Sequence, residues 1–414
     1  MLLKNVLHNN QVCDIQIIGN KIARIAPHMD TNDNDVWDCS GKAILPSFAN
    51  LHTHTPMMFL RGIGADKTLM DWLENAMWPL EAKLRPEHFY PIVRFAILEM
   101  IKTGTTFFLD MYGGDPEGTV SAVDNMGIRA AVPSLALDFF KPAERENRLA
   151  MARKFLSEPC PDRVIKGLSG HAIYTCSEEL IRTLWDWSRQ RNTFFHMHLS
   201  ETGTEVSECI EKHGCRPVEL MKKWDILGPQ TIMAHCVHFN DDEIRLIADS
   251  QTAVAHCPTS NLKLGSGQMD LQKYLNEGVK VALGTDSVAS NNSLSMLSEM
   301  KIAALSAKNK ADSVLAAKVG DIFHLATRAG FEFFGLNAGV IAEGALADFI
   351  LVDLKATFLL PNTDLIANLV YAADSSCITD VFCDGKPLMI GGHVAGEDEI
   401  KAEFLEVCQK LGVG

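Results

Sequence analysis

Between residues 43 and 286 the sequence repeats one unit: a short apolar run, a polar or glycine-containing break, and a longer stretch with helical spacing. Strands that are apolar at nearly every position are typical of parallel sheets covered by helices on both faces. Eight such units favour a closed (β/α)8 TIM barrel over an open doubly wound sheet, and no GxGxxG motif follows the first run to indicate a dinucleotide site. The strand-like runs cover residues 43–52, 105–110, 128–134, 164–170, 193–199, 231–236, 252–258 and 280–286.

The two ends of the chain have a different pattern. Residues 1–42 contain short alternating runs such as VCDIQIIG, which are typical of β-hairpins. From Glu343 the pattern returns to β, with Asp384-Gly385 as an expected tight turn. Because neither end can bury a sheet face alone, we predict a small β-sandwich domain built from both termini. Residues 1–47 and 343–414 would form it, and residues 48–342 would form the barrel.

Charge and hydropathy limit the partners of the chain. The 414 residues include 38 Lys and Arg against 52 Asp and Glu, a formal net charge of −14 that disfavours binding to a nucleic-acid backbone. No apolar run reaches the roughly 18 residues of a membrane span, and Lys4, Asn5 and His8 interrupt the first ten residues before a secretory segment could form. We therefore expect a cytoplasmic protein with no membrane partner. The apolar helical stretch 292–307 would face either the core or a second copy in a homo-oligomer.

Polar side chains stand where the predicted strands end. In a closed barrel the catalytic groups are presented at this rim. His52 and His54 are two residues apart, so on an extended strand they point to the same face and could bind one cation. So many such groups converge on one rim that a metal or catalytic centre is expected there. The other rim residues are His171, His198, Glu201, His235, His256 and Asp286.

The remaining ligands follow from the strand order. Asp286 ends the last run, which lies beside the first in a closed barrel, so its carboxylate can meet the two histidines. His196 and His198 share a face, and His198, nearer the strand end, is the expected ligand, with His196 in a structural role. Three imidazoles and one carboxylate suit Zn²⁺, or Fe²⁺ or Mn²⁺, better than Mg²⁺ or Ca²⁺.

Two further rim residues fit proton transfer. A divalent metal lowers the pKa of a bound water towards about 7 and makes it a nucleophile at neutral pH. Glu201, three residues past His198, is placed to carry a proton between that water and a substrate. His235 is placed to polarise the atom that is attacked.

Five motifs together resemble the amidohydrolase superfamily, and within it the metal-dependent aminohydrolase branch. They are HTH (52–54), HMHLSET (196–202), AHC (234–236), HCPTSNLKLGSG (256–267) and GTDSVASNNSL (284–294). The branch includes S-adenosylhomocysteine and 5′-methylthioadenosine deaminases, guanine deaminase and chlorotriazine hydrolases. Binuclear members carry a carboxylated lysine at the end of strand four, where this chain has Gly170-His171, so the resemblance implies one metal per chain. It assigns the ligands as His52, His54, His198 and Asp286, Glu201 as proton shuttle, His235 beside the attacked centre, and Asp286 also as base for the water.

The segment DWLENAMWPLEAKL (71–84) carries the resemblance to adenosine-type deaminases. It implies that Trp72 packs on the substrate and Glu81 binds the ribose hydroxyls, although a core tryptophan and a solvated carboxylate are alternatives for this helical stretch. Further implied substrate contacts are Arg148, which a charged run could instead leave solvated, His171 and Ser290. Relatives that act on thioether adenosines carry an arginine where this chain has Ser134, which weakens the case for recognition of a homocysteine carboxylate.

The predicted activity is metal-dependent hydrolytic deamination of a 5′-substituted adenosine to the inosine analogue and ammonia. S-adenosylhomocysteine, 5′-methylthioadenosine and adenosine are the expected small-molecule substrates. One alternative is deamination or dechlorination of another heterocycle, such as guanine, a pterin, a cytosine-like base or a chlorotriazine. A more distant alternative is a non-enzymatic barrel scaffold.

Overall fold

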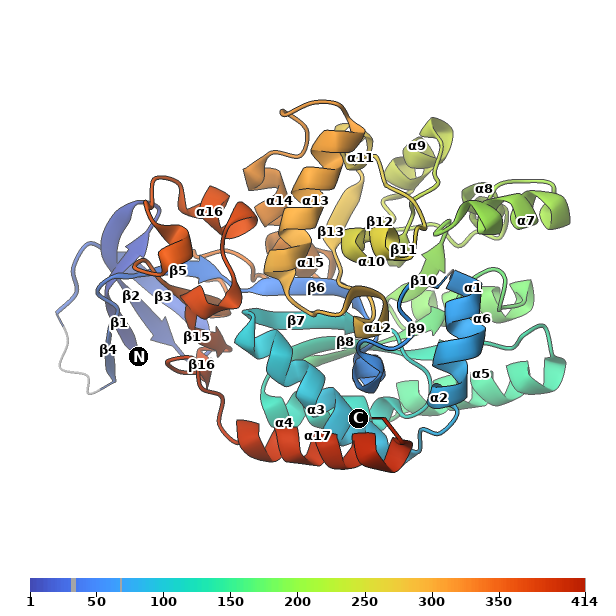
Figure 1. Cartoon of the computed structure of the whole chain (residues 1–414), viewed down its shortest axis with the longest axis horizontal. Helices are drawn as coiled ribbons and strands as arrows, with labels where there is room; N and C mark the ends of the chain where they lie inside the picture. Colours follow the sequence, from blue (N-terminus) through green and yellow to red (C-terminus); the bar gives the residue numbers. More distant parts are fainter. Residues whose placement is uncertain (31–34, 68, 414) are drawn as a thin grey trace.

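The computed structural model describes residues 1–30, 35–67 and 69–413 and shows a barrel with a separate sheet at one end (Figure 1). The barrel sheet has eight parallel strands in the order β13-β12-β11-β10-β9-β8-β7-β6. A parallel bridge between Thr53 and Asp286 joins its two edges, which confirms the predicted (β/α)8 barrel. The strands are β6 (Phe48–Thr53), β7 (Thr105–Asp110), β8 (Arg129–Ala136), β9 (Val164–Gly170), β10 (Phe195–Leu199), β11 (Thr231–His235), β12 (Ala253–His256) and β13 (Lys280–Leu283).

Helices follow the strands and cover the outside of the barrel (Figure 1). Polar N-caps start several of them: the Ser177 side chain accepts a hydrogen bond from the Leu180 N–H, and Asn240 accepts one from Glu243. The elements are η1 (Thr55–Leu60), α1 (Leu69–Trp72), η2 (Leu73–Met77), α2 (Trp78–Glu81), α3 (Pro86–Lys102), α4 (Pro116–Met126), α5 (Pro142–Ser157), α6 (Glu178–Gln190), α7 (Gly203–His213), α8 (Pro217–Lys223), α9 (Asp241–Ser250), α10 (Pro258–Lys263), α11 (Leu271–Asn276), α12 (Val288–Asn291), α13 (Met296–Lys310), α14 (Val319–Ala326) and α15 (Arg328–Phe333).

The first predicted strand, residues 43–52, is in fact two strands in two sheets. β5 (Lys42–Pro46) pairs with the C-terminal part of the chain, and β6 begins the barrel at Phe48. The switch occurs at Ser47, whose N–H donates to the Asp348 carbonyl, whereas the next N–H, of Phe48, donates to Gly104. A continuous apolar run does not show this change of partner, because β5 and β6 are both rich in apolar residues.

Strands from both chain ends form the second sheet, as predicted. Its order is β16-β15-β14-β5-β1-β2-β3, and outside this order β4 pairs in parallel with residues 2–4 of β1. Asp384 and Gly385 join β15 to β16 with φ of 55° and 68°, the left-handed conformation that a two-residue hairpin turn requires. The strands are β1 (Leu2–His8), β2 (Gln11–Ile18), β3 (Lys21–Ala26), β4 (Val36–Asp38), β14 (Phe349–Asp353), β15 (Ile378–Cys383) and β16 (Lys386–Met389).

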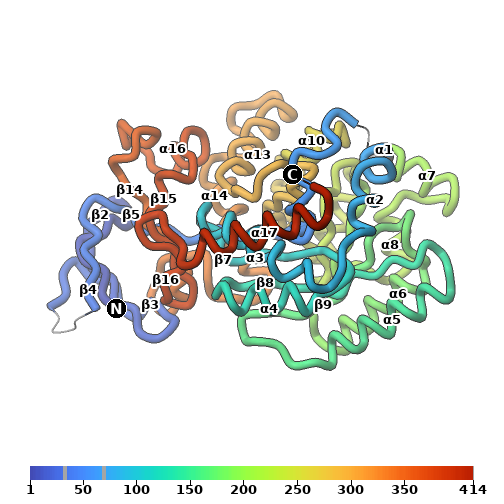
Figure 2. Tube along the Cα trace, turned by 60° about the horizontal axis from the view of Figure 1, so that its bottom comes forward, coloured from blue at the N-terminus to red at the C-terminus, as the bar shows by residue number. Residues whose placement is uncertain are grey.

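The last helix lies on the barrel and not on this sheet. After η3 (Thr357–Leu359), α16 (Leu365–Tyr371) and η4 (Ser375–Cys377), the chain ends in α17 (Glu397–Leu411), which runs along α3 (Figure 2). The rings of Phe95 and Phe404 stack with centroids 4.1 Å apart, and Arg94 pairs with Glu403 at 2.6 Å. The C-terminal segment therefore contributes to both parts of the molecule.

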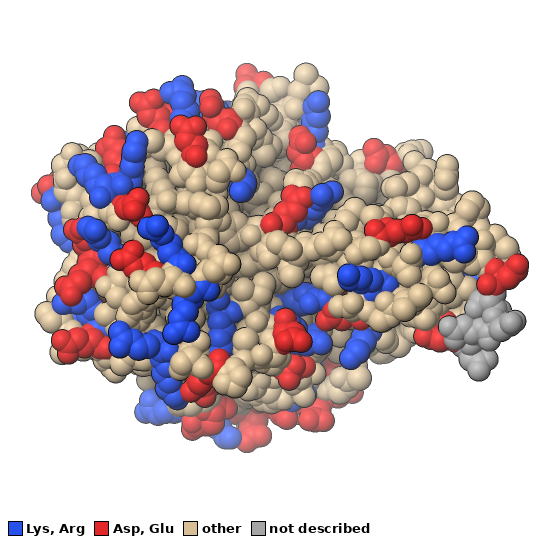
Figure 3. Space-filling model, turned by 180° about the vertical axis from the view of Figure 1, so that it is seen from behind, with Lys and Arg blue, Asp and Glu red and all other residues tan. Residues whose placement is uncertain are grey.

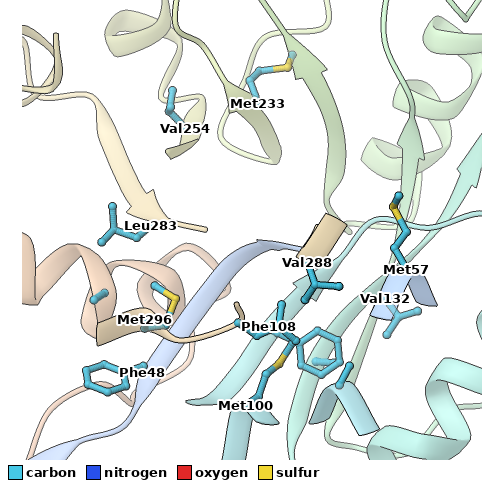
Figure 4. Close-up of a cluster of buried hydrophobic side chains, with 14 of the residues drawn as sticks. Phe48, Met57, Met100, Phe108, Val132, Met233, Val254, Leu283, Val288 and Met296 are labelled. Atoms are coloured by element: carbon cyan, nitrogen blue, oxygen red, sulfur yellow. The ribbon is translucent and has the colours of Figure 1, made fainter. Parts of the chain in front are cut away.

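The largest core lies between the barrel strands and the surrounding helices. Figure 4 shows part of it, where Phe48, Met100 and Phe108 are fully buried. The stretch 292–307 contributes most of α13, whose apolar side chains such as Met296 and Met300 are buried within this chain. In the described part of the chain no helix is both long enough and apolar enough to cross a membrane. On the face seen in Figure 3, acidic and basic side chains are interspersed.

One arginine ties the barrel to the terminal sheet. Arg129 on β8 donates from Nε to the Asp348 carboxylate at 2.8 Å and from Nη2 to Asp384. The Asp348 side chain is fully buried, so removing its partner would leave an uncompensated charge. We expect Arg129→Met to lower the free energy of unfolding by about 3–5 kcal/mol, measured by urea denaturation.

The exposed pair Arg182–Glu178 is the matched control. Its nitrogen and oxygen atoms are 3.1 Å apart, but about half of each side chain is exposed. Arg182→Met should therefore cost less than about 1 kcal/mol. An equal loss of unfolding free energy in the two variants would show that the Arg129 contacts do not stabilise the junction between the barrel and the terminal sheet.

Candidate active site

Histidine and aspartate side chains meet at the rim of the barrel. His52 comes from β6, His54 from the position directly after it, His198 from β10 and Asp286 from the loop after β13. Nitrogens of the three histidines lie within 4.8 Å of one another, and so do ligand atoms of His52, His235 and Asp286. Asp286 Oδ1 is 3.5 Å from His52 Nε2 and 3.1 Å from His54 Nε2. His52 Nε2 is buried and makes no hydrogen bond with a described residue, which leaves its lone pair for a cation.

Each histidine is oriented by an acceptor behind it. Backbone carbonyls accept from Nδ1 of His54 (Met111) and of His198 (His171, 3.0 Å). His196 donates its Nδ1–H to the Ile232 carbonyl at 2.9 Å, so its Nε2 accepts from His52 Nδ1 at 2.8 Å. The rings of His52, His54 and His198 are therefore held in the tautomer that directs an Nε2 lone pair to the middle of the histidine–aspartate cluster. The structural role expected for His196 agrees with this contact.

The charge states suit metal binding. Burial lowers the pKa of His52 to about 3 and that of His198 well below its usual value, so both are neutral at pH 7. Burial opposes the charge of His54 as well, but Asp286 raises its pKa overall. Against the effect of burial, the imidazoles of His52 and His54, whose Nε2 atoms lie 3.5 and 3.1 Å from Asp286 Oδ1, hold the pKa of Asp286 well below its usual range. Neutral imidazoles and an ionised carboxylate are the forms that bind divalent metals.

Asp286 reaches this place through a loop. β13 ends at Leu283, and Asp286 lies three residues later with φ of 60°, where its N–H donates to the His52 carbonyl at 2.9 Å. Its Oδ2 accepts from Ser260 at 2.5 Å and from Ser290 at 3.1 Å. Sequence reasoning missed Ser260, for which the only signal was its place in the HCPTSN motif.

Glu201 and His235 face each other beside the cluster. Glu201 Oε2 and His235 Nε2 are 3.8 Å apart, and His235 Nδ1 is 2.9 Å from Asn261 Oδ1. Burial raises the pKa of Glu201, which favours the protonated carboxyl group that a proton donor needs.

Glu205 fixes the backbone that carries Glu201. Its carboxylate accepts from the N–H groups of Ser200 (2.9 Å) and Glu201 (2.8 Å), while Ser200 has φ of 49°. Burial raises the pKa of Glu205 to about 7. This role of Glu205 could not be predicted from the sequence, because a glutamate four residues after Glu201 is ordinary at the start of a helix.

A cavity of about 510 Å³ opens onto the cluster, and every predicted substrate contact lines it. Trp72 is 5 % exposed and stands at the junction of α1 and the π-helical turn η2. Glu81 Oε1 accepts from the Tyr112 hydroxyl at 2.5 Å. Arg148 lines the cavity, and its Nε is 2.6 Å from Glu144 Oε1. The predicted contacts are Trp72, Glu81, Arg148, His171 and Ser290.

Two other residues of the sequence prediction lie outside the cavity wall. Ser134, which stands where some relatives carry an arginine, is 8 % exposed and does not line the cavity. From the same strand and its extension, Leu135, Leu137 and Phe139 line it. His256 is buried in β12 and is likewise not among the lining residues.

Comparison with known proteins agrees with this site. A 5-methylthioadenosine/S-adenosylhomocysteine deaminase of Thermococcus sibiricus is 41 % identical over 91 % of this chain and 89 % of its own. A 5′-deoxyadenosine deaminase of Methanocaldococcus jannaschii is 37 % identical over 97 % and 96 %. The crystal structure of an adenosine deaminase from Xanthomonas campestris with bound zinc superposes with a TM-score of 0.90 at 28 % identity, covering 97 % of this chain and 94 % of that one.

The model of the amidohydrolase family matches residues 43–388, from β5 to β16. Together with the histidine–aspartate cluster, this match supports a divalent metal at the rim. The match spans the whole barrel and the strands β5, β14, β15 and β16 of the terminal sheet, and relatives over 35 % identical cover nearly the full chain. The chain therefore belongs to the amidohydrolase family.

Proposed function

We propose that this chain is a metal-dependent deaminase that hydrolyses a 5′-substituted adenosine to the inosine analogue and ammonia. The observation that carries the proposal is the convergence, in one cavity, of the histidine–aspartate cluster, the Glu201–His235 pair and the nucleoside-type lining residues Trp72 and Glu81. The names of two relatives, a 5-methylthioadenosine/S-adenosylhomocysteine deaminase and a 5′-deoxyadenosine deaminase, support the same substrate class.

His52, His54, His198 and Asp286 would hold one divalent metal, with Zn²⁺ preferred over Fe²⁺ and Mn²⁺. Nitrogen-rich sites with one carboxylate suit zinc. Nitrogens of His52, His54 and His198 lie within 4.8 Å of one another, and Asp286 Oδ1 is 3.5 Å from His52 and 3.1 Å from His54. Such a metal lowers the pKa of water towards about 7 and so supplies hydroxide at neutral pH.

The protein side chains would move the protons. Asp286, fixed by Ser260 and Ser290, accepts a proton from the attacking water. Glu201 donates a proton to the adjacent ring nitrogen as the C–O bond forms at the carbon that bears the amine. His235, 3.8 Å from Glu201, stabilises the oxygen of the tetrahedral intermediate. Glu201, deprotonated by that step, takes the hydroxyl proton of the tetrahedral intermediate and delivers it to the amine, so that the C–N bond breaks and ammonia leaves. The proton held by Asp286 then restores the acid form of Glu201.

The lining residues would hold the nucleoside. Trp72 offers an aromatic face, and Glu81, held by Tyr112, offers a carboxylate to the ribose hydroxyls. His171, whose Nδ1 is 2.9 Å from Thr175 Oγ1, is neutral because burial lowers its pKa to about 3, and it can hydrogen bond the purine. Arg148 and Ser290 complete the set of substrate contacts.

Ammonia release from a panel of heterocycles tests this function. With Zn²⁺ present, we expect turnover of adenosine analogues and little or none of guanine, pterins, cytosine or chlorotriazines. A buried proton carrier such as Glu201 favours loss of an amine, because a leaving chloride needs less proton delivery. If only one of the other heterocycles were turned over, that heterocycle would replace adenosine analogues as the substrate class. If no compound were turned over, the proposed deaminase activity would be excluded.

A further inference from the structure

We propose that Glu299, a buried glutamate outside the cavity, positions Asp286 by holding together the two segments that surround its carboxylate. The inference rests on the proposed function, in which Asp286 binds the metal and accepts a proton, and it adds a residue that acts through Asp286. Glu299 lies in the first turn of α13, where it is fully buried, and it is not among the residues that line the cavity. It is therefore a positioning residue and not one that meets the substrate.

The first segment is the loop that carries Asp286. Glu299 Oε1 accepts a hydrogen bond from Asn291 Nδ2 at 2.6 Å, and the same amide nitrogen donates to the Thr285 carbonyl at 2.7 Å. Thr285 directly precedes Asp286, and Asn291 ends the short helix α12 that follows it. An amide nitrogen has two N–H groups, and Asn291 uses both of them here. Glu299 thus fixes the side chain that ties the two ends of this loop together.

The second segment is the start of α10. Glu299 Oε2 accepts a longer hydrogen bond from the Thr259 N–H at 3.4 Å. The next residue, Ser260, donates to Asp286 Oδ2 at 2.5 Å, and its Oγ is 2.9 Å from Ser290 Oγ in α12. One carboxyl group on α13 therefore contacts both segments whose serines hold Asp286.

This arrangement sets the direction in which the Asp286 carboxylate points. The hydroxyl groups of Ser260 and Ser290 hold its Oδ2 atom. Its Oδ1 atom lies 3.5 Å from His52 Nε2 and 3.1 Å from His54 Nε2. A shift of α10 against α12 would separate the two serines and let the carboxylate turn away from the histidines. Residues that orient a metal ligand in this way change metal affinity or activity by about 10- to 100-fold when they are replaced.

Fold stability alone does not explain a glutamate at this position. Glutamate is rarely fully buried unless it is paired, and no Lys, Arg or His of the described residues forms an ion pair with Glu299. Its partners are the Asn291 amide and one backbone N–H, which compensate only in part for the loss of water. Burial accordingly raises the pKa of Glu299 to about 7. An apolar side chain would avoid this cost but could not hold the two segments.

Transfer of Zn²⁺ from the metal-loaded full chain to a chromophoric chelator tests the proposal. Glu299→Leu removes both contacts and should weaken the affinity for Zn²⁺ by about 10- to 100-fold and lower kcat by a similar factor. KM for adenosine analogues should stay within about twofold, because Glu299 does not line the cavity. Glu299→Gln keeps a side-chain oxygen for Asn291, so its zinc affinity and kcat should stay within about threefold of those of the unsubstituted chain.

Glu243→Leu is the matched control, because Glu243 is a buried carboxylate that holds α9 and not the site. Glu243 is 1 % exposed, its Oε2 lies 2.8 Å from Arg216 Nε, and it accepts from the Asn240 N–H at 2.9 Å. Its replacement should lower the free energy of unfolding, measured by urea denaturation, and leave the zinc affinity within about twofold.

Asn291→Ala is the second variant, in case Glu299→Leu does not fold. It breaks the link between Glu299 and the Thr285 carbonyl and should weaken the zinc affinity by at least about tenfold. Zinc affinities within about twofold of the unsubstituted chain in the folded variants would overturn the positioning role. An equal loss of affinity in Glu299→Leu and Glu243→Leu would overturn it as well. Zinc transfer needs no substrate, so a chain that binds zinc but deaminates no adenosine analogue would lose the proposed function, while the affinities would still decide the role of Glu299.

Discussion

Replacing Glu201 by glutamine is expected to lower kcat for adenosine analogues by about 10²- to 10⁴-fold. Glutamine keeps the size of the side chain and can still contact Ser266, but it cannot carry a proton to the ring nitrogen or the leaving amine. KM should change little, because Glu201 is proposed to act on the reacting atoms and not on the ribose. Initial rates of ammonia release over a range of substrate concentrations provide the measurement.

Glu208→Gln is the matched control for this variant. Glu208 lies on α7, seven residues further along the chain, with its side chain exposed. Its replacement should leave kcat unchanged. A Glu201→Gln variant that retains more than about a tenth of the activity would contradict the proton-carrier role, since general acid catalysis alone contributes more than that.

Replacing His198 by asparagine is expected to remove the bound metal and lower activity by about 10³-fold or more. The reason is structural as well as chemical: His198 is one of three histidines whose nitrogens lie within 4.8 Å of one another, and the Nδ1 of His198 is fixed by the His171 carbonyl. Metal analysis of the purified chain gives a readout that is independent of activity. We expect about one divalent ion per unsubstituted chain and much less than one in the variant.

His213→Asn serves as the control, because His213 ends α7 away from the cavity. Its metal content and activity should equal those of the unsubstituted chain. Circular dichroism shows whether His198→Asn keeps the fold. A folded variant that still binds one metal and turns over substrate would exclude His198 from the ligand set.

Much of the barrel could be predicted from local pattern. The eight apolar runs correspond to β6–β13 within a few residues, since a buried parallel strand needs apolar side chains on both faces. The run at 43–52 was the exception, because the change of sheet at Ser47 leaves no local signal. A stretch with helical spacing is also predicted after each apolar run, and for α6, which follows β9, the Ser177 cap explains where the helix begins.

The candidate site was predictable only in part. The two-residue spacing of His52 and His54 places both rings on one face whatever the rest of the chain does. The hydrogen bonds that orient the site residues were not predictable. The His196–His52 hydrogen bond requires that β6 and β10 place these two residues at the same height in the barrel. The hydrogen bond from the Ser200 N–H to Glu205 requires the left-handed conformation of Ser200.

The sequence by itself therefore determined the fold class and the identity of the chemical groups at the rim. Both depend on short periodicities, in which a residue's neighbours decide whether it is buried and which way it points. The tertiary structure alone decided that Asp286, carried past the end of β13 by a loop, meets His52 where the barrel closes. It also decided that Leu135, Leu137 and Phe139, and not Ser134, face the cavity. These contacts depend on the relative depth and rotation of strands that are far apart in the chain, which local pattern does not specify.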